Sequence, residues 1–304
     1  MARPTMRDTH IDTALGNISI AYRNESYIWD QVFPMVPVEN RSDEYYVYDK
    51  GYWFADEAQR RAQGTRAARG GYKISSCTYT CQEFAIAKAV TDGMRDNADD
   101  PIKPEIEAVE YSTDRLLLRL ERDVAGEVFG NNWSGSATPS PTWDDDTSDP
   151  LGDMENAIST FIGTIGRKPN VGVMGYQVLR DLKVHPDILD RIKYTERGIV
   201  TEDLLAALFG LDKLLVGTAI YNTAAEEATA SLSFIWGKHF WFGYVPPSPG
   251  LMIPAAGYCF VWKDRVVERF REDQEHQDIF SCSQSWKVVL TAKDAGYKLK
   301  SVVA

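Results

Sequence analysis

One apolar and aromatic stretch decides the fold: YIWDQVFPMVPV, from Tyr27 to Val38. Its two prolines exclude a helix interior and a central strand over its second half. A residue before proline favours an extended conformation, so we expect Phe33 and Val36 to be extended. Such a rigid, apolar segment must be covered by its own domain or by a neighbouring subunit. The chain that follows favours the neighbouring subunit, with Trp29, Phe33 and Pro34 as candidate contacts.

The next segment predicts a long hairpin. Residues 44–54 are aromatic and β-branched and predict a strand, and a second extended run from about Cys77 to Val90 alternates at period two. Residues 55–71 between them hold no large apolar side chain. They carry four arginines: Arg60, Arg61, Arg66 and Arg69. A two-stranded ribbon alone is marginal in water, so we expect a partner to stabilise this arm. The alternative is a disordered surface loop between ordinary strands.

A long helix is predicted from Glu105 to about Phe129. Pro104 suits its first turn, acidic residues at 105 and 107 favour the positive end of the helix dipole, and Gly130 is a natural stop. Its apolar positions recur at helical spacing but keep no strict heptad. We therefore expect one helix lying across a sheet rather than a coiled coil.

The remaining chain mixes helices and strands without a βαβ rhythm, which predicts the α+β class. The best domain boundary is the stretch from Trp133 to Pro150, which is rich in Ser, Thr, Pro, Gly and Asp. Aromatic strands follow near residues 231–245 and 257–262, and long strands near 266–270 and 280–290.

Charge and apolar content narrow the class of protein. The formal net charge of the 304 residues is −11 and the pI is about 4.9, which argues against a general nucleic-acid binder. No run approaches the roughly 18 residues of a membrane span, and the start has no signal-peptide core. We expect a protein made in the cytosol, with its four cysteines as structural thiols.

No pattern of catalytic residues stands out. Nucleotide-binding and nucleophile motifs are absent from the sequence, and the four histidines form no metal pair. The acidic run Asp144 to Asp146, with Asp149 and Asp153, fails the calcium-loop pattern and reads as a solvated linker. We therefore expect no enzyme, no cofactor and no metal site.

In the order of its elements the chain resembles the major capsid proteins of tailed bacteriophages, with the Hong Kong 97-like fold. The resemblance covers nearly the whole chain. It rests on residues 27–38, 45–49, 214–224 and 234–238 together with that order.

The resemblance implies four parts and a structural role. Residues 1–40 would be the N-terminal arm and 41–88 the E-loop hairpin. Residues 89–149 and 265–304 would form the peripheral domain, with its spine helix at about 105–129, and 150–264 the axial domain. The loop near Asn222 to Ala230 would face the axis. The chain would self-assemble through hexamers and pentamers into an icosahedral head enclosing double-stranded DNA.

Partners follow from the same resemblance. The arm begins almost at Met1, which favours a separate scaffolding protein; a portal and a decoration protein are further expectations. We expect DNA to be faced without sequence-specific binding, no membrane contact, assembly in the host cytoplasm and a final place in the virion. The basic hairpin tip is expected to meet acidic groups of a neighbour, with Glu105, Glu107 and Glu110 as candidates.

Two other classes of protein remain open. An encapsulin-type nanocompartment shares the fold, although its usual N-terminal helix fits poorly with Pro34 and Pro37. A soluble oligomeric binding protein with a dispensable hairpin is the other.

Overall fold

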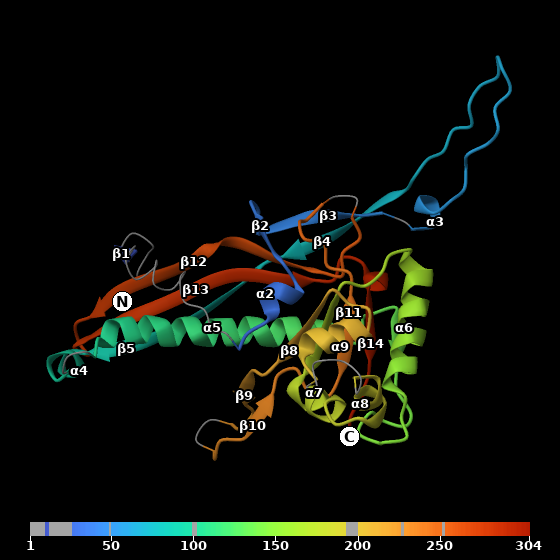
Figure 1. Ribbon diagram of the computed structural model, residues 1–304. Helices are drawn as coiled ribbons and strands as arrows, with labels where there is room; N and C mark the ends of the chain where they lie inside the picture. Colours follow the sequence, from blue (N-terminus) through green and yellow to red (C-terminus); the bar gives the residue numbers. More distant parts are fainter. Residues whose placement is uncertain are drawn as a thin grey trace.

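The computed structural model describes residues 10–11, 26–48, 50–98, 102–192, 200–225, 228–250 and 253–304. Two five-stranded sheets lie at the two ends of the body, joined by one long helix, and a hairpin arm projects from it (Figure 1). Most of the expected N-terminal arm before residue 26 lies outside the described residues.

The first sheet is long and mostly antiparallel. Its strand order is β1-β12-β13-β5, and β2 pairs with β12 in parallel. The strands are β1 (His10–Ile11), β2 (Met35–Val38), β5 (Gln82–Thr91), β12 (Tyr258–Glu272) and β13 (Gln277–Val289). Pro37 lies in the edge strand β2, the position that a residue without an N–H tolerates.

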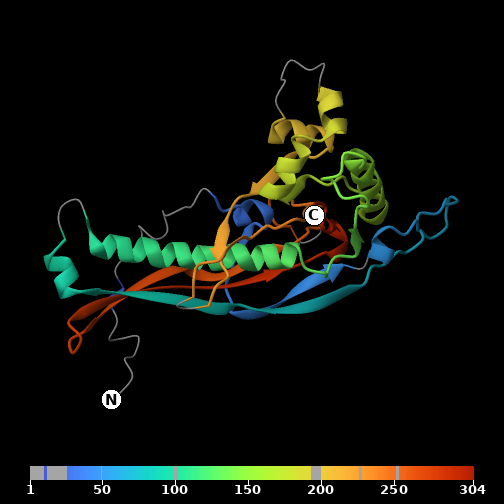
Figure 2. The ribbon, with the colours of Figure 1, turned by 90° about the horizontal axis from the view of Figure 1, so that it is seen from below.

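The predicted long helix is confirmed as α5 (Pro104–Val128), with proline in its first turn and Glu105 and Glu107 near its positive end. It lies along one face of the first sheet, above β5 and β13 (Figure 2). The apolar stripe explains this placement. Leu116, Leu117, Leu120 and Val124 are all buried, whereas Arg115 and Arg119 are exposed.

The second sheet has the order β6-β14-β11-β7-β8. Its strands are β6 (Gly135–Ala137), β7 (Val171–Gly175), β8 (Lys213–Gly217), β11 (Phe240–Gly243) and β14 (Gly296–Leu299). The helices near it are α6 (Pro150–Ile165), α7 (Tyr176–Leu182), α8 (Pro186–Ile192) and α9 (Glu202–Leu208). A separate ribbon, β9 (Ile220–Asn222) with β10 (Leu232–Phe234), reaches back toward α5.

Several predicted boundaries differ from the structure. The extended run expected from about Cys77 to Val90 is divided into β4 (Ile74–Thr80) and β5, and the strands expected at 257–262 and 266–270 form the single strand β12. The strand expected over residues 44–54 ends at Tyr48, as β3 (Ser42–Tyr48), and a turn of helix, α3 (Lys50–Trp53), follows. The stretch 133–150 is not a solvated linker, because Trp133 and Trp143 are buried and β6 joins the second sheet. Strand β14, expected in the peripheral domain, also belongs to the second sheet.

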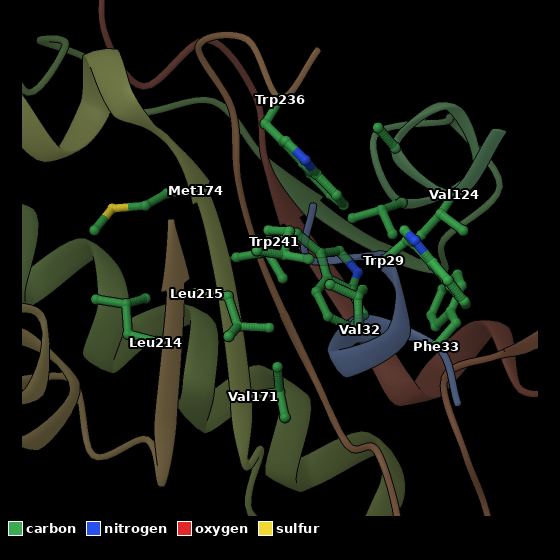
Figure 3. Packing of buried hydrophobic residues seen from close by; sticks show 14 of the residues in the cluster. Trp29, Val32, Phe33, Val124, Val171, Met174, Leu214, Leu215, Trp236 and Trp241 are labelled. Atoms are coloured by element: carbon green, nitrogen blue, oxygen red, sulfur yellow. The ribbon is translucent and has the colours of Figure 1, made fainter. Parts of the chain in front are cut away.

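The apolar segment that begins at Tyr27 is covered by its own chain. Trp29 and Phe33 lie in the main hydrophobic core beside Trp241 and Val124 (Figure 3). They are 8 % and 0 % exposed, which corrects the expectation that they contact a neighbour. Residues 29–32 form a short helix, α2 (Trp29–Val32), and Phe33 and Val36 are extended as predicted. Pairing of β2 with β12 holds the segment down, so α2 packs against α5.

Glycines end two neighbouring strands where the chain at Trp236 and Gly237 packs closely: Gly175 faces the backbone carbonyl of Gly237, and Gly217 faces the ring of Trp236. Gly175 at the end of β7 is in register with Gly217 at the end of β8. A Cβ on Gly217 would lie 2.0 Å from Cδ1 of Trp236, which is fully buried. The indole thus wedges against the second sheet where only glycine leaves space.

Substituting Gly217→Ala therefore forces the wedge out of place. We expect the free energy of unfolding to fall by about 2 kcal/mol, as for overpacking in a rigid core. Gly163→Ala is the matched control, because this exposed α6 glycine has no atom within 4 Å of a built Cβ. It should gain about 0.5–1 kcal/mol from helix propensity. Urea unfolding of unassembled subunits measures both. Equal effects of the two substitutions would contradict the wedge.

Candidate subunit interface

The base of the hairpin arm is built into the body. Strand β3 pairs with β4 (Ile74–Thr80), and their inner face packs on the first sheet. Tyr79 and Tyr45 lie 4.7 and 6.0 Å from the ring of Phe260. Lys50, the first residue of α3 just beyond β3, forms a 2.6 Å ion pair with Asp294. The arm therefore has a fixed origin and direction.

The tip beyond this base has no core. Every residue from Phe54 to Thr78 is exposed, and the four arginines 60, 61, 66 and 69 form no ion pair within the described chain. Figure 1 shows the tip extending well clear of the body. A side-chain and a backbone bond from Thr65 to Ala62 close its turn. The tip is thus positioned to meet another molecule.

The arm also exposes large apolar side chains that the sequence analysis does not single out. They are Tyr46 and Phe54, each 62 % exposed, with Tyr72 and Ile74. An apolar cluster on a projecting ribbon is typical of an interaction surface. The sequence signal for this exposed surface is that β3 carries apolar residues at successive positions, and therefore on both of its faces. Beneath the arm, a groove of about 880 Å³ opens between β3 and the C-terminal end of α6.

The opposite end of the molecule is acidic. There the turn between β12 and β13 exposes Asp273 and Glu275, with Glu272 beside them. Helix α4 (Asp92–Asp96) and the start of α5 add Asp96, Glu107 and Glu110. Both views place this end far from the arm tip. The chain therefore separates charge along its length.

A buried carboxylate organises that acidic end. Asp278 is 4 % exposed and accepts hydrogen bonds from Arg95 and, at 2.8 Å, from Arg269. Burial would raise the pKa of Asp278, but the two guanidinium groups outweigh it and hold that pKa below its ordinary value. Glu105 pairs with the same arginines at 3.0 and 3.6 Å. Of the three glutamates expected to meet a neighbour, Glu105 is therefore already paired within its own chain.

Glu107 and Glu110 stay predicted interface residues, exposed and half-exposed. Pro34 is half-buried and is likewise still a prediction.

Two further buried charges tie α5 to the rest of the chain. Glu121 accepts hydrogen bonds from the backbone of Ile28 and Trp29 and from the indole of Trp236. Lys298 on β14, 4 % exposed, donates to the carbonyls of Phe129 and Gly130 just beyond the last turn of α5. Burial lowers the pKa of Lys298. A cation at a helix C-terminus opposes the dipole and satisfies free carbonyls.

Polar residues that drew attention in the sequence have structural partners. Asp149 caps α6 and Asp153 accepts from the indole of Trp143. His185, for which the sequence predicts a surface or capping role, is buried at the start of α8, where it bonds to Ser148 and accepts from the backbone N–H of Asp187 in the first turn, as a capping residue does. In the described residues no group of three His, Cys, Asp or Glu could hold a metal ion, and no helix could cross a membrane. None of the four cysteines forms a disulfide within the described residues, and three are buried.

The two sheets, the helix that joins them and the projecting hairpin define the Hong Kong 97-like fold. Among solved structures, a phage-related protein from Bordetella bronchiseptica superposes with a TM-score of 0.75 and 24 % identity, covering 97 % of this chain and 98 % of that one. The capsid protein of cyanophage P-SCSP1u gives 0.61 at 8 % identity, covering 92 % and 89 %. The SrpI encapsulin of Synechococcus elongatus gives 0.60 at 10 %, covering 96 % of each. The predicted fold is confirmed.

Sequence relatives are more specific than the fold about the class of protein. The chain is 27 % identical to the major capsid protein of Burkholderia phage BcepMu, over 96 % of each chain. It is 28 % identical to the major capsid protein of Pseudomonas phage JBD67, over 97 % of each. No protein-family model matches the chain. The predicted resemblance to phage major capsid proteins is confirmed, and the encapsulin alternative has less support.

The Asp278 cluster makes a pH-dependent contribution that can be tested. Asp278→Asn leaves three arginines, Arg95, Arg269 and Arg271, without their buried partner, and we expect it to lower the free energy of unfolding by about 2 kcal/mol near neutral pH. A lowered pKa means that this contribution is present above about pH 4 and is lost as pH falls below the ordinary aspartate range. Wild type and variant should therefore converge in acid. Urea unfolding between pH 3 and 7 measures this.

Asp273→Asn is the control. Its side chain is 92 % exposed and pairs with Arg271 at only 3.4 Å, so the change should stay within about 0.5 kcal/mol. A gap between Asp278→Asn and wild type that persists unchanged to pH 3 would contradict the assignment.

Proposed function

We propose that this chain is the structural subunit of a tailed-phage head shell and carries out no catalysis. The observation that carries the proposal is the exposed, coreless arm on a Hong Kong 97-like body, in a chain that is similar end to end to phage major capsid proteins. An arm that crosses a neighbour adds interface area without a larger core. The subunit belongs in the virion, after assembly in the host cytoplasm.

The copies assemble through hexamers and pentamers into a closed shell around double-stranded DNA. The first sheet with α5 is the peripheral domain and the second sheet with α6 to α9 the axial domain. Pairing of β6 and β14 within the second sheet, and of β12 within the first, supports assigning β6 and β14 to the axial domain and β12 to the peripheral domain. A separate scaffolding protein, a portal and a decoration protein are the partners that this role calls for. The net charge of −11 suits a container that must not bind its DNA tightly.

Neighbouring copies meet head to tail, the basic arm tip of one against the acidic end of the next. The tip arginines are exposed, and Glu107, Glu110, Glu272, Asp273 and Glu275 supply the opposite charge. A contact between two different patches of one chain forms a ring when its rotation closes, which is the arrangement that hexamers and pentamers of a shell require. Rim pairs are worth about 0–1 kcal/mol each, so they set register and association rate more than stability. The exposed Tyr46 and Tyr72 supply the apolar part of the contact.

An encapsulin-type nanocompartment is the second candidate because it shares the fold. Both full-length sequence relatives above are phage capsid proteins, which favours the head shell. A soluble binding protein with a dispensable hairpin is the weakest candidate.

Deleting residues 55–71 tests the role of the arm. The deletion removes no buried side chain, so the subunit should fold with an unchanged circular dichroism spectrum and melting temperature. Without the tip we expect no shells by analytical ultracentrifugation, only subunits and small oligomers. Unchanged quaternary structure would support the soluble binding protein.

Charge reversal tests the head-to-tail contact. Replacing the four tip arginines by Glu, or Glu272, Asp273 and Glu275 by Lys, should each reduce assembly at least tenfold at low salt, through like-charge contact. Both sets together in one chain should restore assembly. Reversal of Asp144, Asp145 and Asp146, which lie elsewhere, should not rescue the arginine variant. Equal rescue by the two acidic sets would disprove the pairing.

A further inference from the structure

Glu121 is a fully buried carboxylate that joins three separate parts of the chain. It lies on α5 and accepts at 3.2 Å from Ile28 N and at 2.9 Å from Trp29 N, the first amides of α2. On the other side it accepts at 2.5 Å from the indole N–H of Trp236. One side chain therefore hydrogen-bonds both to the N-terminal segment and to Trp236, which packs against the second sheet.

No cation balances this charge among the described residues. Arg122, next to it on α5, stacks on Tyr221 at 4.3 Å, and Lys238, near Trp236, donates to the carbonyl of Ala304. Lys213, across from α2, donates to Gln31. The charged group on α2 is Asp30, and its negative charge opposes ionisation of Glu121. Three N–H groups alone must compensate a carboxylate taken out of water.

We propose that Glu121 is a proton-dependent joint that sets how tightly the N-terminal segment and the Trp236 wedge are held to α5. When the carboxyl is protonated, the cost of holding a charge out of water disappears, and this gain outweighs the preference of the three N–H groups for the ionised form. When it is ionised, an open conformation that returns it to water becomes more favourable. The joint is therefore tight in mild acid and looser at neutral and alkaline pH.

The titration range makes the joint responsive near neutrality. Burial raises the pKa of Glu121 to about 7, against the lowering effect of its three hydrogen bonds. In an open conformation the pKa returns to the ordinary glutamate range, near 4.5. Opening is thus promoted as pH rises between these two values and gains nothing further above the higher one.

The consequence reaches both sheets. The ring of Trp236 fills the space left by Gly217 and packs edge-on against Phe129 at 5.7 Å. Trp29 shares the same core, as Figure 3 shows. Release of Glu121 therefore loosens the N-terminal segment and the second sheet together, rather than either one alone. This inference concerns contacts inside one chain and stands independently of the shell function.

Hydrogen exchange of the full chain, followed by mass spectrometry from pH 5 to 8.5, tests the joint. After correction for the intrinsic pH dependence of exchange, protection of residues 27–33 and 234–237 should fall together, on the order of a hundredfold, between pH 5 and 7. It should then level off. Protection that stays constant across this range, or that changes in only one of the two segments, would overturn the proposal.

Three variants separate the joint from general loosening. Glu121→Gln should abolish the pH dependence in both segments. Asp114→Asn is the matched control, because this half-exposed carboxylate accepts from Tyr27 at 3.2 Å and should leave the pH dependence intact. Trp236→Phe removes one bond to the charged form and should move the midpoint to higher pH. If Glu121→Gln does not fold, an unshifted midpoint in Trp236→Phe overturns the proposal.

Discussion

The burial of α5 is the constraint on which the rest of the structure depends. Its 25 residues are fixed by polar contacts at three levels. Arginines held by the buried Asp278 pair with Glu105 in its first turn, Glu121 binds two other segments in its middle, and Lys298 caps its end. A helix held in this way transmits position from the acidic end to the second sheet. Apolar packing alone would let it slide or rotate, whereas each buried charge has one acceptable arrangement.

Sequence reasoning recovered the parts of the fold that depend on local patterns. The helical stripe and Pro104 predicted α5 nearly to the residue, and period-two alternation predicted β5, although the single run expected from about Cys77 to Val90 is divided between β4 of the hairpin and β5 of the first sheet. It did not find which apolar segments pair, because periodicity identifies a buried face and not its partner. Trp29 and Phe33 were assigned to a neighbour for this reason, although their own α5 and second sheet cover them. Strand 44–54 was made too long because aromatic content continues through α3.

The buried charges were the least predictable part of the structure. Glu121 falls in phase with the buried Leu117 and Ala125 on α5, one turn from each, and that spacing was the available signal. Asp278 likewise falls at one of the alternate positions of β13 that are buried. A charged residue is expected from sequence to face solvent, and only the folded structure shows which groups pair with Glu121 and Asp278 in the interior. The tip arginines were recognisable because nothing around them in the sequence could bury them.

The hairpin arm projects from the body of the subunit, and its tip is exposed to solvent. The arm is rigid at its base, apolar along one face and basic at its tip, whereas the far end of the same chain is acidic. Complementary surfaces at opposite ends favour assembly over folding back, because the arm cannot reach its own acidic end. We therefore infer that the closed assembly is the functional state and that the subunit is its building block.

Electron cryo-microscopy of the purified protein, expressed alone and with candidate scaffolding proteins, tests this account most directly. The account predicts closed icosahedral shells in which each arm crosses a neighbouring copy and its tip lies beside that copy's acidic end. Small uniform particles under both conditions, with the arm free in solvent, would contradict it.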